Sequence, residues 1–99
     1  MKIAKQIYHG VVGTALSEVY AVPTGKKAIV KRIVLINIDT SSHFVSIKIG
    51  GIYYIKSRTL TSNETYSFDA LVVLNEGDTI QGECSNPNKI YAFIDGAEY

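Results

Sequence analysis

Two histidines, one cysteine and an acidic neighbour are the side chains in this sequence that could hold a metal. They are His9, His43, Glu83 and Cys84. A zinc or non-haem iron site needs three or four converging ligands, usually with two of them close together in the sequence. The sequence has no His-x-His, Cys-x-x-Cys or His-Glu-x-x-His motif, so these residues would have to meet entirely through the fold. We expect ordinary histidines, no metal and no other cofactor.

Serine is frequent, but no serine lies in a sequence setting typical of a nucleophile. Nucleophilic catalysis needs a serine or cysteine beside a histidine and a carboxylate. There is no Gly-x-Ser-x-Gly motif, and Ser41–Ser42–His43 is typical of a turn in which short polar side chains bond their own backbone. The single cysteine, Cys84, lies in the strand-like stretch TIQGEC, where we expect a small buried side chain rather than a reactive thiol. We predict that the protein is not an enzyme.

Length and charge restrict the classes of partner. The 99 residues are enough for one domain, which we expect to span 1–99 around one core. The net charge is +1, from ten basic and nine acidic residues spread along the chain, and no basic stripe predicts nucleic-acid binding. No apolar run has the length of a signal-peptide core or of a membrane span, which is about 18 residues. We therefore expect no nucleic-acid or membrane partner and synthesis in a cytoplasm.

Turn residues recur at close intervals, and β-branched and aromatic residues dominate the stretches between them. No helical periodicity lasts three turns, and the aromatic residues are seven tyrosines and three phenylalanines. Short strands at this spacing predict an all-β fold, which we interpret as an antiparallel, jelly-roll-like β-sandwich. Residues 3–9 and 15–22 are predicted to form one or two opening strands. The further predicted strands are 27–38, 43–49, 52–56, 64–74, 79–84 and 90–95. Pro23 and Gly25 are predicted to form one structural turn, and Gly77 and Asp78 to form a second tight turn.

The strand predicted over 27–38 is apolar on both faces. Only one face can meet the core of a two-layer sandwich, and monomers seldom expose an apolar stripe. A returning segment from residues 1–12, another subunit or a foreign partner could cover the second face. We favour another subunit and predict Val34 and Ile36 as interface residues. Strict alternation places Ala28, Val30, Arg32, Val34, Ile36 and Ile38 on one face, and Ile29, Lys31, Ile33, Leu35 and Asn37 on the other.

Two adjacent tyrosines, Tyr53 and Tyr54, place an aromatic ring on each face of one predicted strand. At least one ring should therefore point away from the core. Exposed tyrosine suits a protein interface, because the ring offers apolar area with a polar tip, and it suits sugar stacking for the same reason. We predict both as interface residues. The alternative is a carbohydrate- or receptor-binding module in which Tyr53, Tyr54 and Tyr91 form a platform for a glycan.

Three stretches resemble small β-sandwich structural proteins of tailed-bacteriophage virions. Residues 16–33, LSEVYAVPTGKKAIVKRI, resemble the opening of these proteins, and Asn37 falls on the asparagine of their pattern. Residues 73–80, VLNEGDTI, and 94–98, IDGAE, resemble a later turn and the closing stretch. The resemblance implies a non-enzymatic virion part, either a head decoration protein or a module of tail, baseplate or fibre. Such a protein would be a homo-oligomer, for example a trimer, would contact other virion proteins, and would be made in the host bacterial cytoplasm.

Overall fold

The computed structural model describes residues 3–86 and 89–99, with side chains from residue 7 onward, and places eight strands there. The strands are β1 (Ile3–Val11), β2 (Ser17–Ala21), β3 (Ala28–Asn37), β4 (His43–Ile49), β5 (Ile52–Leu60), β6 (Thr65–Leu74), β7 (Thr79–Cys84) and β8 (Ile90–Glu98). The predicted turn at 86–88 falls partly outside the described residues. No helix in the described part of the chain could span a membrane.

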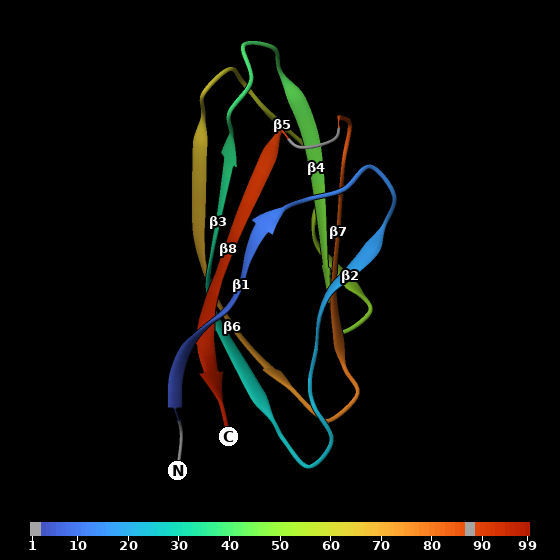
Figure 1. Ribbon diagram of the computed structural model, residues 1–99, viewed down its shortest axis with the longest axis vertical. Coiled ribbons are helices and arrows are strands. Elements are labelled where there is room, and N and C mark those ends of the chain that lie inside the picture. The colour runs from blue at the N-terminus through green and yellow to red at the C-terminus, as the bar shows by residue number, and fades with distance from the viewer. Residues whose placement is uncertain (1–2, 87–88) are drawn as a thin grey trace.

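The strand order is that of a long hairpin wound into two layers. β1 pairs with β8, β2 with β7, β3 with β6 and β4 with β5, all antiparallel. The further pairs β3 with β8 and β4 with β7 complete a first sheet, β1-β8-β3-β6, and a second sheet, β2-β7-β4-β5. Figure 1 shows the two sheets facing each other. This is the double Greek key of a jelly roll, which confirms the predicted fold class.

The core lies between the sheets, and alternating side chains of β4, β6, β7 and β8 supply much of it. In β4 the buried residues Val45, Ile47 and Ile49 share one face, as predicted. β7 and β8 alternate in the same way, with their core residues fully or almost fully buried. Fully burying one aliphatic side chain of this size stabilises a fold by about 1.5–3 kcal/mol. The largest such side chains include Ile33, Leu35, Ile47, Ile49, Leu60, Leu74, Ile80, Ile90 and Ile94.

Strand β3 contains a β-bulge that reverses its alternation. Val30 and Ile33 both face the core, and Lys31 and Arg32 between them are both exposed. Against β8 the extra residue at this point lies in β3, whereas against β6 the register shifts because Ala70 and Leu71 of β6 together lie opposite Lys31. A bulge adds one residue, so every later side chain changes face. The two continuous faces predicted from strict alternation are therefore wrong: Val34 lies on the outer face, opposite to Val30.

The N-terminal segment does not cover the outer face of β3. Residues 3–11 form the edge strand β1, which pairs with β8 in the plane of the first sheet (Figure 1). Val12 then enters the core, and its N–H donates to the carbonyl of Ile90 at 2.8 Å. Residues 1–2 of the predicted covering segment lie outside the described residues. Among the residues that the structure describes, no part of the N-terminal arm shields that face.

Two reverse turns meet at one end of the sandwich. In residues 23–26 the N–H of Lys26 donates to the carbonyl of Pro23 at 3.1 Å, and Gly25 has φ of 79°. In residues 75–78 the corresponding bond is 3.0 Å, and Gly77 has φ of 85°. A positive φ at the third position defines a type II turn and favours glycine. The carboxylate of Asp78 also accepts the N–H of Asn75 at 2.9 Å, which holds the second turn closed.

Two side-chain contacts join the two sheets. The hydroxyl of Tyr20 on β2 donates to the carboxylate of Glu98 on β8 at 2.6 Å. Burial and this bond raise the pKa of Tyr20 well above its ordinary value. On the opposite edge the guanidinium of Arg58 on β5 lies 3.7 Å from the ring centroid of Tyr66 on β6, a cation–π contact.

Candidate functional site

The outer face of the first sheet carries an apolar patch at its centre. The pairing places Tyr91 beside Ile36 in one row and Phe93 beside Val34 in the next. These four residues, which we call the outer patch, lie on the two central strands β8 and β3. Tyr91 is 37% exposed, and the other three are half-buried between their neighbours. His9 on β1 extends the second row, because its ring stacks on Phe93 with centroids 6.2 Å apart and planes 12° apart.

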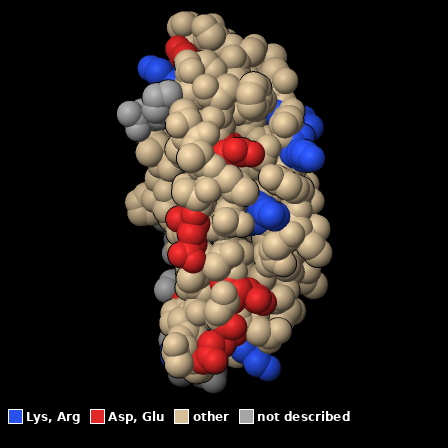
Figure 2. All heavy atoms as spheres, turned by 90° about the vertical axis from the view of Figure 1, so that its right-hand side faces the viewer, with Lys and Arg blue, Asp and Glu red and all other residues tan. Residues whose placement is uncertain are grey.

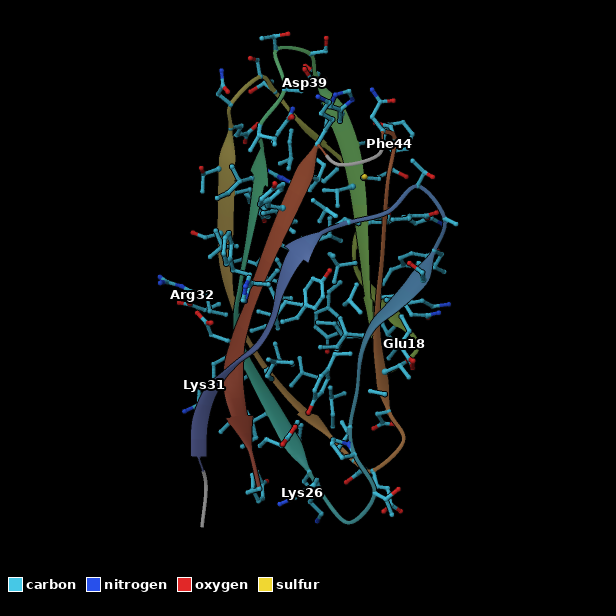
Figure 3. All side chains as sticks on the ribbon, in the orientation of Figure 1. Glu18, Lys26, Lys31, Arg32, Asp39 and Phe44 are labelled. Atoms are coloured by element: carbon cyan, nitrogen blue, oxygen red, sulfur yellow. The ribbon has the colours of Figure 1, made fainter. Side chains whose placement is uncertain are left out.

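A charged row borders the outer patch. Arg32 lies between Asp95 on β8 and Asp69 on β6, and its Nε is 3.5 Å from Oδ1 of Asp69. Both members of this ion pair are largely exposed, so the pair contributes little to stability. Figure 3 shows Lys31 and Arg32 projecting away from the second sheet. An apolar centre with a charged rim is the usual composition of a protein–protein interface.

The outer face of the second sheet is polar at the corresponding place. Ser46 pairs with Glu83, and Lys48 pairs with Gln81, in its central rows. Figure 2, which looks onto this side of the sandwich, shows acidic and basic residues spread over the surface. The exposed Phe44 lies at the start of β4, far from the β4–β5 turn, so it forms no central patch. The two outer faces therefore differ in chemistry.

The predicted interface tyrosines lie on the second sheet, away from the outer patch. Tyr53 is 37% and Tyr54 46% exposed, both on the edge strand β5. The ammonium groups of Lys48 and Lys56 each lie 5.2 Å from the ring centroid of Tyr53. Because Tyr91 lies on the outer face of the first sheet, the three tyrosines do not form one stacking platform. The structure divides the predicted interface residues between two opposite surfaces.

A cluster of Asp39, His43 and Ser85 was not predicted from the sequence. Nε2 of His43 lies 2.7 Å from Oδ2 of Asp39, and Nδ1 lies 3.3 Å from Oγ of Ser85. The bond from His43, followed by one from the N–H of Thr40, lowers the pKa of Asp39. Ser85 comes from the end of β7, which pairs with β4, so only the strand order brings it to His43. No local sequence signal could have found it.

The geometry of this cluster supports a role as a structural clamp. Oγ of Ser85 also accepts the N–H of Phe44 at 3.1 Å, and the N–H of Ser85 donates to the carbonyl of Phe44 at 3.0 Å. Within residues 3–86 and 89–99 no pocket is formed. The cluster holds the turn at Asp39, at one end of the sandwich in Figure 3, against β4 and β7.

This clamp predicts a pH-dependent contribution to stability. Because the folded pKa of Asp39 lies below its ordinary value of 3.8, its contribution is complete above about pH 5 and is lost as the pH falls through the folded value. We expect Asp39→Asn to lower the free energy of unfolding at pH 7. In the wild-type protein that free energy should fall between about pH 5 and pH 2, and in the variant it should fall less steeply. Urea denaturation across this range measures both. An unchanged pH profile in the variant would contradict the assigned role.

The remaining candidate ligands do not converge. His9 lies on the outer face of the first sheet, and His43 lies at the start of β4 in the second. The described part of the chain contains no group of three metal-binding side chains. Cys84 is buried, as predicted, and its thiol lies 3.1 Å from the carbonyl of Val12. Burial raises the pKa of this thiol, which disfavours the reactive thiolate.

Comparisons with known proteins find distant structural similarities and assign no function. No family model and no curated protein matches the chain. The core of Drosophila NLP, whose structure was studied for pentamer formation and histone binding, is 13% identical to this chain and has a TM-score of 0.47. The match covers 100% of this chain and 96% of that one. A Bacillus endospore appendage protein, from a family of disulfide-linked pili, is 13% identical with coverages of 100% and 84% and a TM-score of 0.49.

Proposed function

We propose that the protein is a non-enzymatic structural subunit that binds other copies of itself through the outer patch. The observation that carries this proposal is the contrast between the two outer faces. The central rows of the first sheet are apolar, whereas those of the second sheet hold serine, lysine, glutamine and glutamate. If this face stayed in water, Tyr91 and Phe93 in adjacent rows would contribute no free energy of burial. A face that another subunit covers gains the free energy of burying them.

The charges around the outer patch suit a second copy better than a strongly charged partner. The net charge of the chain is only +1. The bordering row contains both signs, with Arg32 between Asp69 and Asp95. When two copies meet about a two-fold axis, each basic group can face an acidic group of the other. The rim is therefore compatible with self-association.

The finer role that we propose is in the virion of a tailed bacteriophage. The support is the resemblance over residues 16–33, 73–80 and 94–98, together with a jelly-roll fold that recurs in capsid domains. The same fold also serves lectins, so the fold alone does not decide the role. In this proposal the subunit is a head decoration protein or a tail or fibre module that contacts other virion proteins. It would be made in the host bacterial cytoplasm.

Charge placed in the outer patch tests the proposal. We expect Val34→Asp and Ile36→Asp each to lower the mass of the native assembly, because a carboxylate at a covered apolar position would have to be desolvated. Native mass spectrometry and sedimentation velocity at micromolar concentration measure that mass. Thr59→Asp is the matched control, since Thr59 is exposed on the second sheet and should leave the mass unchanged.

Folding of the variants is checked separately by cooperative urea unfolding and circular dichroism. Both side chains are already half-exposed in the single chain, so the variants should stay folded. Wild-type assembly mass in both aspartate variants would reject the outer patch as the contact. A wild-type protein that sediments as a monomer at micromolar concentration would reject self-association itself.

A further inference from the structure

Two lysine ammonium groups meet at one tyrosine ring on the outer face of the second sheet. Lys48 on β4 pairs with Tyr53 on the edge strand β5. The ammonium nitrogens of Lys48 and Lys56 each lie 5.2 Å from the centroid of the Tyr53 ring, so they are no more than twice that distance apart. We call Lys48, Tyr53 and Lys56 the basic cluster. It gathers two positive charges around one exposed aromatic side chain.

Two irregularities in β5 bring these side chains to the same face. Tyr54 is one residue in excess against β4, and further along the strand Lys56 and Ser57 together lie opposite Ser46. Oγ of Ser46 accepts the N–H of Ser57 at 2.8 Å, which fixes this second bulge. In a regular strand Tyr53 and Lys56, three residues apart, would point to opposite faces. Bulges redirect side chains in this way, often next to functional sites.

The outer face of the second sheet separates its charges. In the described part of the chain no ion pair joins Lys48 or Lys56 to a carboxylate. The acidic side chains Glu18 and Glu83 lie on the other two strands of the sheet, β2 and β7. Figure 2 shows a group of basic side chains toward the right-hand margin of this side and most of the acidic ones elsewhere. The face therefore has a basic half on β4 and β5 and an acidic half on β2 and β7.

One anionic group could bond to both ammonium groups of the basic cluster. Attraction to the tyrosine ring orients each ammonium but leaves N–H donors for a further partner. A carboxylate has two oxygens and can accept a charge-assisted hydrogen bond from each lysine. Gln81 follows Lys48 in the same row of the sheet. Its amide can both donate to and accept from a hydroxyl group beside that carboxylate.

The surroundings of the basic cluster restrict the molecule that carries this carboxylate. A nucleic acid has closely spaced phosphates, which the acidic half of the face would repel, and the net charge of the chain is only +1. An extended acidic peptide would add to a regular sheet edge. The edge strand β5 is irregular, with two register shifts and Ser57 at φ of 51°. A saccharide with widely spaced acidic groups and many hydroxyls fits both the charges and the amide.

We infer that the basic cluster binds an acidic saccharide, with a sugar carboxylate between Lys48 and Lys56 and a neighbouring hydroxyl on Gln81. Tyr53 orients the two ammonium groups. The cluster lies on the sheet opposite to the outer patch, so an assembly formed through the outer patch leaves it accessible. Several copies could then bind one polysaccharide together, which would compensate for weak binding at each single site.

A nuclear magnetic resonance titration with sodium glucuronate tests this inference, with glucose as the neutral match. We expect saturable shifts at the backbone amides of Lys48, Tyr53 and Lys56 with glucuronate, and binding of glucose weaker by about tenfold or more, the usual effect of losing a hydrogen bond to a charged group. Lys48→Gln and Lys56→Gln should each weaken glucuronate binding. Lys26→Gln removes the same charge from an exposed turn and should leave binding unchanged.

Three results would overturn the inference. The first is equal binding of glucose and glucuronate, and the second is unchanged glucuronate binding in both Lys48→Gln and Lys56→Gln. The third is a thymidine oligonucleotide or sodium sulfate that shifts the same amides at lower concentration than glucuronate, since the cluster would then not select a sugar acid. The glutamine variants should keep the mass of the native assembly, so failure of this inference leaves the proposed self-association standing.

Discussion

Gly96→Ala is expected to destabilise the protein more than any substitution on its surface. A Cβ at Gly96 would overlap the carbonyl oxygen of Ile29 and lie 2.9 Å from Cδ1 of Ile7. The first obstacle is backbone, which cannot rotate aside, so β8 would have to move away from β3 beside the bulge. Overpacking of a core commonly costs about 1–3 kcal/mol, and a backbone obstacle should bring this change to the top of that range or beyond. A loss of that size is a large part of the roughly 5–15 kcal/mol that holds a domain together.

Urea denaturation followed by circular dichroism measures the effect. The matched control is Gly82→Ala, because Gly82 also lies in a strand facing the core. Its Cβ would meet flexible side chains, at 3.3 Å from Val12 and 3.4 Å from Ile47, which can adjust. We expect the loss in Gly96→Ala to be clearly larger. Equal losses in the two variants would mean that β8 and β3 are not held together as closely as described.

Asn37→Asp is expected to be the second most damaging change, and its cost should depend on pH. Asn37 is fully buried, and its Nδ2 lies 2.9, 3.0 and 3.1 Å from the carbonyls of Ser41, Leu60 and Thr61. An aspartate would direct oxygen at these acceptors and leave them unsatisfied, at about 1–3 kcal/mol for each group and more once it is charged. The N–H of Asp39, which now donates to Oδ1 at 3.0 Å, would be the only donor that still bonds to it.

The sign of the pH dependence follows from that environment. Facing carbonyl oxygens, the new carboxyl would have a pKa above its unfolded value of about 3.9, so the variant should lose stability relative to wild type as the pH rises from 4 to 7. Urea denaturation at both pH values, with the exposed Asn63→Asp as control, tests this. A penalty for Asn37→Asp that did not grow with pH would contradict the hydrogen-bond pattern assigned to Asn37.

The sequence was sufficient to predict the fold class and most of the core. Alternation in β4, β7 and β8 is local and regular, and glycines mark the turns between strands. The extent of β5 was underestimated, because exposed polar residues and the positive φ of Ser57 interrupt its pattern after Lys56. β8 was predicted over 90–95, but it continues through Gly96 to Glu98. Both errors arise where a strand departs from simple alternation.

The site required information that local patterns do not contain. The bulge in β3 depends on its pairing with β8 and β6, and the adjacent Lys31 and Arg32 were its only trace in the sequence. Tyr53 and Ile36 lie on opposite sheets because of the strand order. The spacing of residues in the sequence does not determine that order. Side-chain type therefore identified apolar and aromatic candidates, while tertiary pairing decided which of them share a surface.

Hydroxyl-radical footprinting of two tyrosines tests the central claim most directly. Tyr91 in the outer patch and Tyr53 on the second sheet are the same residue type and are both 37% exposed in the single chain. If another copy covers the outer patch, Tyr91 should be oxidised several-fold more slowly than Tyr53 in the wild-type assembly, and Ile36→Asp should bring the two rates together. Equal oxidation of Tyr91 and Tyr53 in the wild-type protein would show that the outer patch is open to water and would contradict the account.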